Sequence, residues 1–208
     1  MIKCEKQMTF EECEMAVLRS SIDNIDKKKG EEMFHNPQII KIITIVEKFI
    51  KTHKLICYGG TAINNILPEN DQFYNKNVEL PDYDFFSPTP LKHAKELADI
   101  YYDNGFIEVE AKSGVHSGTF KVFVNYIPVA DITYLNEQLY KSIKKKSIKR
   151  NKIFYAPVNF LRMSMYLELS RPDGNVSRWE KVLKRLNLLN KNYPLNKNIC
   201  KNMSFEKL

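Results

Sequence analysis

Hydrophobic and polar positions follow two different periods along the chain, which separates the expected helices from the expected strands. The clearest helical stretch is "HNPQIIKIITIVEKFIKTHK", in which Asn36 can cap a helix and Pro37 suits its first turn. Apolar residues then recur every three or four positions, at Ile39, Ile42, Ile43, Val46, Phe49 and Ile50. A stripe with this period predicts a helix with one buried face.

Three later stretches repeat the helical period. Residues 90–104 place apolar side chains on one face and are followed by Gly105, a residue type that often ends helices. The segments "PVNFLRMSMYLELS" and "NVSRWEKVLKRLNLLN" have the same spacing. In the second segment the expected buried stripe consists of Trp179, Val182, Leu183, Leu186 and Leu189. Residues 5–30 mix charge with a looser helical spacing, and we expect a surface helix there.

Shorter apolar runs predict strands. "LICYGG" is a strand pattern that stops at Gly59 and Gly60, and "DYDFFS" is a second strand pattern. "FIEVEAK", "TFKVFVNY" and "IPVADITYL" follow with short turns between them, which is typical of antiparallel neighbours. The pattern therefore predicts an α+β fold, with a small mixed β-sheet backed by helices and followed by a helical C-terminal region.

Composition argues against a disordered chain and against a membrane protein. With 208 residues and 43% hydrophobic content, the chain is long enough to bury one sizeable core. The longest apolar run, "IIKIITIVEKFI", is interrupted by lysine, and the start of the chain has no secretory signal pattern. We therefore expect a cytoplasmic protein with no membrane partner.

Charge is distributed unevenly between the two halves of the chain. Residues 1–110 contain 13 Lys or Arg against 19 Asp or Glu, whereas residues 111–208 contain 19 against 6. The basic half suits contact with a polyanion, and the dense run from Lys141 to Lys152 is the best candidate for phosphate contacts. The candidate RNA-binding residues are Lys144, Lys145, Lys146, Lys149 and Arg150. The alternative is that these side chains only solvate a surface segment.

The glycine pair and the second strand carry the first candidate chemistry. Glycines after a strand let backbone N–H groups approach an anion, so Gly59, Gly60 and Thr61 are candidates for holding phosphates. Asp82 and Asp84 are two residues apart on a strand, so both carboxylates point to the same side. Two such carboxylates repel each other unless a cation lies between them, and Mg²⁺ prefers carboxylates together with substrate phosphates.

Asp131 is the natural third carboxylate. It lies in the middle of the apolar strand "IPVADITYL", where an acid is costly without a partner or a metal ion. An isolated aspartate is commonly only a turn or cap residue. The glycine turn, the D-x-D strand and the later in-strand aspartate together favour a two-metal phosphoryl-transfer site.

Four segments carry a resemblance to a known family. "YGGTAIN", "LPDYDFFS", "VADITYL" and "NFLRMSMYLELSRPDGNVSRWEKVLKRLNLL" resemble the poly(A) polymerase catalytic subunits of large cytoplasmic DNA viruses, a branch of the DNA polymerase β-like nucleotidyltransferase superfamily. The similarity spans Asn36 to Pro194, and members of the family generally continue well beyond 208 residues. The resemblance implies a nucleotidyltransferase palm and template-independent addition of AMP from ATP to RNA 3′ ends.

The family pattern also implies roles for the candidate residues. Asp82 and Asp84 would bind two Mg²⁺ or Mn²⁺ ions, and Asp131 would complete the catalytic metal site. Gly59, Gly60 and Thr61 would hold the triphosphate of ATP. By this comparison residues 1–35 form an N-terminal helical extension, 36–140 the catalytic domain and 141–208 a basic, mainly helical region.

Two alternatives stay open beside this reading. One is a nucleotidyltransferase with an acceptor other than RNA, because the superfamily modifies many molecules. The other is a non-catalytic RNA-binding or partner-subunit module that keeps the fold. A second copy of the chain or a processivity subunit is left open as a partner, and the location would be the host cytoplasm or the virion if the protein is viral.

Overall fold

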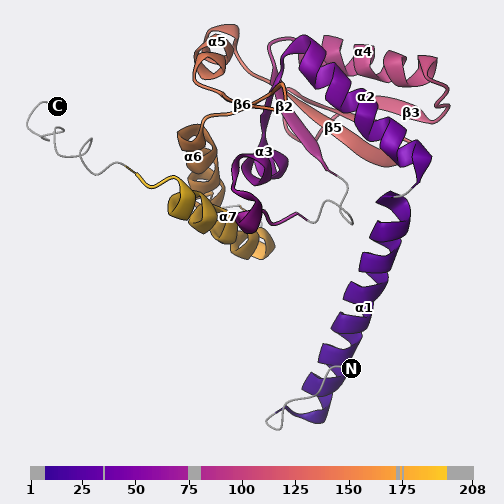
Figure 1. Ribbon diagram of the computed structural model, residues 1–208, viewed down its shortest axis with the longest axis vertical. Helices are drawn as coiled ribbons and strands as arrows, with labels where there is room; N and C mark the ends of the chain where they lie inside the picture. The colour runs from indigo at the N-terminus through magenta and orange to yellow at the C-terminus, as the bar shows by residue number, and fades with distance from the viewer. Residues whose placement is uncertain (1–7, 35, 75–80, 172–173, 175, 196–208) are drawn as a thin grey trace, which may run out of the picture.

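The computed structural model describes residues 8–34, 36–74, 81–171, 174 and 176–195 (Figure 1). The α-helices are α1 (Phe10–Phe34), α2 (Pro37–His53), α3 (Gly59–Ile66), α4 (Pro90–Asp103), α5 (Glu137–Lys145), α6 (Val158–Leu169) and α7 (Trp179–Asn192), with 3₁₀ turns η1 (Glu69–Asp71) and η2 (Val176–Arg178). The strands are β1 (Ile56–Tyr58), β2 (Tyr83–Ser87), β3 (Val109–Ser113), β4 (Thr119–Val124), β5 (Ile127–Tyr134), β6 (Ile148–Arg150) and β7 (Ile153–Tyr155).

These strands form one mixed sheet in the order β3-β4-β5-β2-β1-β7-β6. Strands β3, β4 and β5 are antiparallel neighbours, as their close spacing in the sequence predicts. Two pairs are parallel, β2 with β5 and β1 with β7. The α+β fold with a mixed sheet is thus confirmed, and the central strands β5, β2 and β1 carry the residues that the sequence marks for chemistry.

Helices α2 and α4 cover one face of the sheet (Figure 1). Asn36 caps α2 by accepting a hydrogen bond from the backbone N–H of Gln38 at 2.9 Å, and the helix ends at Lys54 in the left-handed conformation. The Tyr101 hydroxyl of α4 donates to the backbone oxygen of Ile42 at 2.8 Å and ties the two helices together. The predicted buried stripe of α2 is confirmed, except that Ile43 is only half-buried.

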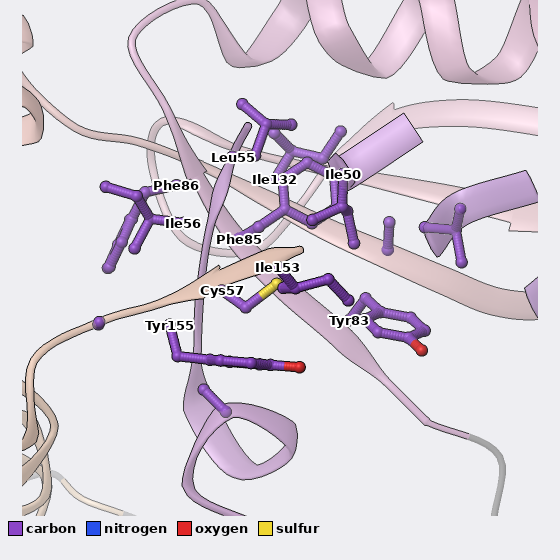
Figure 2. Packing of buried hydrophobic residues seen from close by; sticks show 14 of the residues in the cluster. Ile50, Leu55, Ile56, Cys57, Tyr83, Phe85, Phe86, Ile132, Ile153 and Tyr155 are labelled. Carbon is purple, nitrogen blue, oxygen red and sulfur yellow. The ribbon is translucent and has the colours of Figure 1, made fainter. Parts of the chain in front are cut away.

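Alternate residues of β2 pack against these helices. Figure 2 shows Phe85 of β2 and Ile132 of β5, neighbours in the parallel register, grouped with Ile50 of α2. All three side chains are fully buried. Burial of a large apolar side chain contributes about 1.5–3 kcal/mol, so this cluster anchors the centre of the sheet. Tyr83, which faces the same way, donates its hydroxyl to Glu47 of α2 at 2.7 Å.

The opposite face of the sheet lies against α3 and α6. Phe86 of β2 stacks on Tyr58 of β1, with ring centroids 3.9 Å apart, and meets Phe160 of α6 edge-on at 5.6 Å. Since residues 82, 84 and 86 share one side of the chain, this packing turns Asp82 and Asp84 toward the α6 side of the sheet.

The hairpin of β6 and β7 is an addition that the helical pattern of the C-terminal region does not predict. Strand β6 lies within the basic run and β7 directly follows it, and β7 extends the sheet by pairing with β1. Residues on both sides of position 140 therefore share one sheet. The division into regions 1–35, 36–140 and 141–208 stays a prediction.

None of the helices in the described residues combines the length and the apolar character that a membrane span requires.

Candidate active site

A row of polar side chains crosses the centre of the sheet. Lys121 of β4 lies opposite Asp131 of β5 in the strand register, Asp131 lies opposite Asp84 of β2, and Asp84 lies opposite Tyr58 of β1. Residues that are opposite in register project from the same face. Lys121 forms an ion pair with Asp131, which fixes the orientation of this carboxylate.

Asp82 lies immediately before β2 and on the same side as Asp84. Its backbone is held by α3, because the Thr61 hydroxyl donates to the Asp82 carbonyl oxygen at 2.7 Å. Thr61 is buried. Its side chain therefore positions one of the carboxylates, and its hydroxyl is already engaged.

The glycine pair opens α3 directly beside the carboxylates. Gly59 has a φ of +71°, and a Cβ atom built on it would lie 2.9 Å from the Asp84 carboxyl carbon. A Cβ atom on Gly60 would lie 2.9 Å from an Nη atom of Arg185 and would also clash with the Tyr74 hydroxyl. Both positions thus bring backbone close to charged side chains, which any larger residue would prevent.

A cleft of about 600 Å³ contains these groups and is lined from β1, α3, β2, β4, β5, α6 and α7. Its acidic lining residues are Asp82, Asp84, Asp131 and Glu168. Its basic lining residues are Lys121, Arg178, Lys181 and Arg185. The three aspartates thus lie at the strand side, whereas Glu168 belongs to α6 and three of the four cations belong to η2 and α7. This arrangement suits a polyanion accompanied by divalent cations.

Arg185 is the most firmly placed of the basic residues. Its guanidinium lies over the rings of Phe73 and Tyr74, 5.0 and 5.6 Å from their centroids, and donates to the Tyr74 hydroxyl at 2.7 Å. Its Nε atom is buried and has no hydrogen-bond partner within the described part of the chain. A buried, unpaired donor is costly, so this group has capacity for an anionic ligand.

The carboxylates raise one another's pKa. Burial is the largest cause for Asp84, followed by the negative charges of Asp82 and Asp131, and together they raise its pKa to about 7. Asp82 lines the cleft, although the residue as a whole is exposed. The cleft walls still desolvate its carboxyl, and this effect and then Asp131 raise its pKa. Positive charge from Lys121 acts in the opposite direction on both groups without cancelling the shift.

We expect Asp84→Asn to stabilise the metal-free protein at pH 8. The carboxyl has a pKa of about 7 when folded against an ordinary value of 3.8, so the folded state binds the extra proton between these values. The stability of the wild type therefore falls as the pH rises from 4 to 7, whereas a neutral asparagine avoids this loss. In EDTA, the Tm of the variant should exceed that of the wild type by about 5 °C or more at pH 8 and by less at pH 5.

Asp71→Asn is the matched control for this measurement. Lys191 and Asn192 donate to the Asp71 carboxylate, each at 2.7 Å, and these hydrogen bonds lower its pKa. Removal of the Asp71 carboxylate should therefore lower the Tm at pH 8, whereas Asp84→Asn should raise it. A Tm difference for Asp84→Asn that does not change between pH 5 and pH 8 would contradict the raised pKa.

The structure brings most of the predicted site residues together. Asp82, Asp84, Asp131, Gly59 and Gly60 line the cleft. The basic run lies on α5 and the β6–β7 hairpin instead. The catalytic and nucleotide-binding roles of the five cleft residues stay predictions.

The five basic candidates have local contacts of their own. Lys144 and Lys149 each lie 5.4 Å from the centroid of the Phe154 ring. The Arg150 guanidinium donates to the backbone oxygens of Asn65 and Leu67, at 3.1 and 3.3 Å. Lys145 and Lys146, at the end of α5, are exposed. Binding of RNA by these residues stays a prediction, and Arg150 already has a structural role.

The sequence identifies the basic wall of the cleft only in part. Lys121 belongs to a strand whose alternating pattern does not mark it for chemistry, and only the strand register places it opposite Asp131. Arg185 and Tyr74 are 111 residues apart. The sequence makes Arg178 and Arg185 candidates for contacts with phosphate or RNA, because both lie near apolar positions of a predicted helix, and surface ion pairs are the alternative.

Comparison with known proteins identifies the family. The model of the poly(A) polymerase catalytic subunit family matches residues 44–175. A protein of African swine fever virus assigned as such a subunit is 34% identical over 164 residues, which cover 76% of this chain and 34% of that protein. A mimivirus protein with the same assignment is 32% identical over 158 residues, covering 74% of this chain and 26% of that protein.

Solved structures agree with the sequence comparison. The crystal structure of the Megavirus polyadenylate synthase superposes with a TM-score of 0.79 and 29% identity, covering 95% of this chain and 41% of that one. JHP933 from Helicobacter pylori shares the fold, with a TM-score of 0.51 at 11% identity over 76% of this chain and 68% of that one.

The extent of these matches settles the family. The chain spans about a third of the length of the viral relatives it matches first, 34% for the African swine fever virus protein. The family model covers residues 44–175, more than half of the 208 residues, and it includes Gly59, Asp84 and Asp131. The fold is the α+β fold of a nucleotidyltransferase. The chain belongs to the poly(A) polymerase catalytic subunit family.

Proposed function

We propose that this chain carries the catalytic domain of a template-independent polynucleotide adenylyltransferase, which adds AMP from ATP to RNA 3′ ends. One observation carries the proposal: Asp82, Asp84 and Asp131 share a cleft with the first turn of α3, in a chain of the poly(A) polymerase catalytic subunit family. The match covers only 34% of the African swine fever virus protein, so activity in this chain is the proposal to be tested.

The three carboxylates fit a divalent metal site. The pKa of Asp84 is raised by burial and by its two acidic neighbours, and the positive charges of Lys121 and Arg185 do not fully offset this effect, so the group can accept further positive charge. Oxygen ligands of this kind suit Mg²⁺ or Mn²⁺, and Asp82, Asp84 and Asp131 would hold the two ions. Bound ions of this type neutralise charge on the reacting phosphate and make the attacking hydroxyl more acidic.

The α3 and α7 sides of the cleft fit the triphosphate of ATP. The backbone of Gly59 and Gly60 lies at the N-terminus of α3, where N–H groups and the helix dipole favour an anion. Arg185 approaches Gly60 from the other side, and its position is fixed by Phe73 and Tyr74. We therefore assign Arg185 to the triphosphate, with Lys181 of the same helix as a second cation of this wall.

The residues of the sheet orient the acceptor. Asp131, held by its ion pair with Lys121, lies where it can align the 3′-hydroxyl of the RNA and favour loss of its proton. The 3′-oxygen then forms a bond to the α-phosphorus while the bond to pyrophosphate breaks. Catalysis comes from positioning and charge neutralisation, and no protein side chain forms a covalent intermediate.

Several parts of this function rest on the family alone. The preference for ATP over other nucleotides is inferred from the relatives, as are an RNA 3′ end as acceptor and a second copy or a processivity subunit as partner. The basic half of the chain, with 19 Lys or Arg against 6 Asp or Glu in residues 111–208, supports a polyanionic acceptor. The cytoplasmic or virion location stays a prediction.

The decisive experiment is extension of a labelled oligo(A) primer with each of the four nucleoside triphosphates, in Mg²⁺ or in Mn²⁺. We expect a ladder of products with ATP. Modification of a non-RNA acceptor that oligo(A) does not compete for would favour the first alternative. Binding of the primer with no addition under any condition would leave an RNA-binding or partner-subunit module as the better account.

We expect Arg185→Ala to weaken ATP binding by about tenfold to a hundredfold, because a hydrogen bond to a charged group contributes about 1.5–3 kcal/mol. The change should appear mainly in the KM for ATP and in direct ATP titrations, with the primer KM little changed. Arg185→Lys should restore part of the affinity, since it keeps the charge but not the planar fork.

Arg178→Ala is the control for this variant. Arg178 lines the same cleft, but it is paired with Glu168 at 3.1 Å and its side chain is 58% exposed. We expect a change below about threefold, as for a solvent-exposed ion pair. Equal effects of the two substitutions would contradict a specific role of Arg185.

A further inference from the structure

A second group of potential metal ligands lies on the face of the sheet away from the cleft. His53 is the last residue of α2, and His93 and Glu96 lie three residues apart on α4. One ligand atom of each residue lies within 4.8 Å of the others. Positions three apart share one face of a helix, so α4 presents both side chains to the end of α2.

The three side chains are already oriented toward one another. The Nε2 atom of His53 is 3.0 Å from Oε1 of Glu96. The two imidazole rings have centroids 5.0 Å apart. All three residues are half-buried, so the group is shielded but still reachable from solvent.

A neighbouring residue holds His93 as metal-binding histidines are commonly held. The Nδ1 atom of His93 lies 2.6 Å from the Ser87 hydroxyl, which also accepts the backbone N–H of Thr89 at 2.9 Å. A hydrogen bond at one ring nitrogen fixes the ring and leaves the other nitrogen for a metal. Phe49 of α2 covers both rings, with centroid distances of 4.3 Å to His53 and 5.8 Å to His93.

The composition of the group selects the ion. Two imidazoles and one carboxylate are a common ligand set for Zn²⁺, whereas Mg²⁺ and Mn²⁺ prefer the oxygen ligands of the cleft. Tetrahedral zinc with bonds of about 2.0–2.1 Å places its ligand atoms roughly 3.4 Å apart. The present spacing of up to 4.8 Å therefore needs only small side-chain rotations to close around the ion.

We propose that His53, His93 and Glu96 form a zinc site that ties the end of α2 to the start of α4. The fourth ligand would be water. His53 is separated by two residues from β1, the strand that leads into Gly59. Zinc bound here would therefore stabilise the element that carries the glycine turn, and the site is separate from the proposed catalytic metals.

The test uses the 208-residue chain after removal of metal with EDTA. We expect it to bind one equivalent of Zn²⁺ that survives dialysis against excess Mg²⁺, and to gain Tm on binding. Co²⁺ as a probe should give the strong visible absorption of a four-coordinate site with nitrogen ligands, and one equivalent of Zn²⁺ should abolish it. Six-coordinate oxygen sites absorb far more weakly, which separates this group from the cleft.

Glu96→Gln and His53→Gln test the residues. Glu96→Gln keeps an acceptor for the hydrogen bond from His53 but removes the carboxylate, so it should weaken zinc binding by more than about tenfold. Its Tm in EDTA should stay close to that of the wild type. Asp82→Asn/Asp84→Asn, in the cleft, should bind zinc as the wild type does.

Three outcomes would overturn the proposal. These are the absence of tight zinc binding by the wild type, zinc binding that survives both ligand substitutions, and zinc binding that disappears with the cleft carboxylates. The first would mean that the group is a hydrogen-bonded contact between two helices. None of these results depends on nucleotidyltransferase activity, so failure here is distinguishable from failure of the proposed function.

Discussion

Replacing Asp84 with asparagine should lower the rate of AMP addition by about a thousandfold, with the amount of folded protein unchanged. Asp84 is the central carboxylate of the cleft, opposite Asp131 in the strand register and two residues from Asp82. An asparagine keeps the shape but removes the negative charge that holds divalent ions. The same substitution should stabilise the metal-free protein at pH 8, so loss of activity cannot be attributed to unfolding.

Primer extension under single-turnover conditions measures this effect. Residues that act as one unit give non-additive losses, so Asp82→Ala/Asp84→Ala should be little worse than the single substitution. Asp71→Asn is the control, because Asp71 is an acid outside the cleft that pairs with Lys191 at 2.7 Å. Activity of Asp84→Asn within tenfold of the wild type would exclude this carboxylate from the catalytic site.

Much of the fold follows from periodic patterns in the sequence. The stripe on α2 predicts the helix and its buried face, because six apolar positions at helical spacing allow few other structures, and five of the six are buried. The alternation of β2 predicts that Asp82 and Asp84 face one way. Asp131 is predicted from the need of a two-metal site for a third carboxylate and from the cost of an acid in an apolar strand, and in the structure it is paired with Lys121.

Other elements leave too little signal in the sequence. Strands β6 and β7 have three residues each, too few to display a period, and β6 is embedded in the basic run that ends just before β7. Asn151 and Lys152, at the turn between them, have φ values of 50° and 66°, and such turns are only weakly marked by a single asparagine. The pairing of β7 with β1 depends on contacts across about a hundred residues.

The helix α7 shows a different limit. Trp179, which the stripe places in the core, is 39% exposed, and Leu183 is 50% exposed, whereas Val182, Leu186 and Leu189 are buried. A helical stripe gives the apolar side of a helix, but the position of the packing partner, here α6, decides which edge of the stripe is covered. The helical pattern likewise does not give the contacts of Arg185, because they depend on the loop residues Phe73 and Tyr74.

Gly59→Ala should nearly abolish activity and also lower stability. Gly59 has a φ of +71°, and the new methyl group would lie 2.9 Å from the Asp84 carboxyl carbon. The strained backbone costs about 1–3 kcal/mol. The methyl group must in addition displace either Asp84 or the first turn of α3, which separates the carboxylates from the proposed triphosphate site. A misplacement of about 1 Å can cost about a hundredfold in rate, so we expect a loss of at least that size.

Gly105→Ala separates the two effects of this substitution. Gly105 also has a positive φ, +89°, but a Cβ atom there meets nothing within 4 Å. Gly105→Ala should therefore lower the free energy of unfolding by about 1 kcal/mol, through backbone strain alone, and leave AMP addition unchanged. Urea unfolding and primer extension of both variants give the comparison. Equal losses of activity would mean that general destabilisation is responsible. A loss confined to Gly59→Ala would show that close approach of the α3 backbone to Asp84 is required for the reaction.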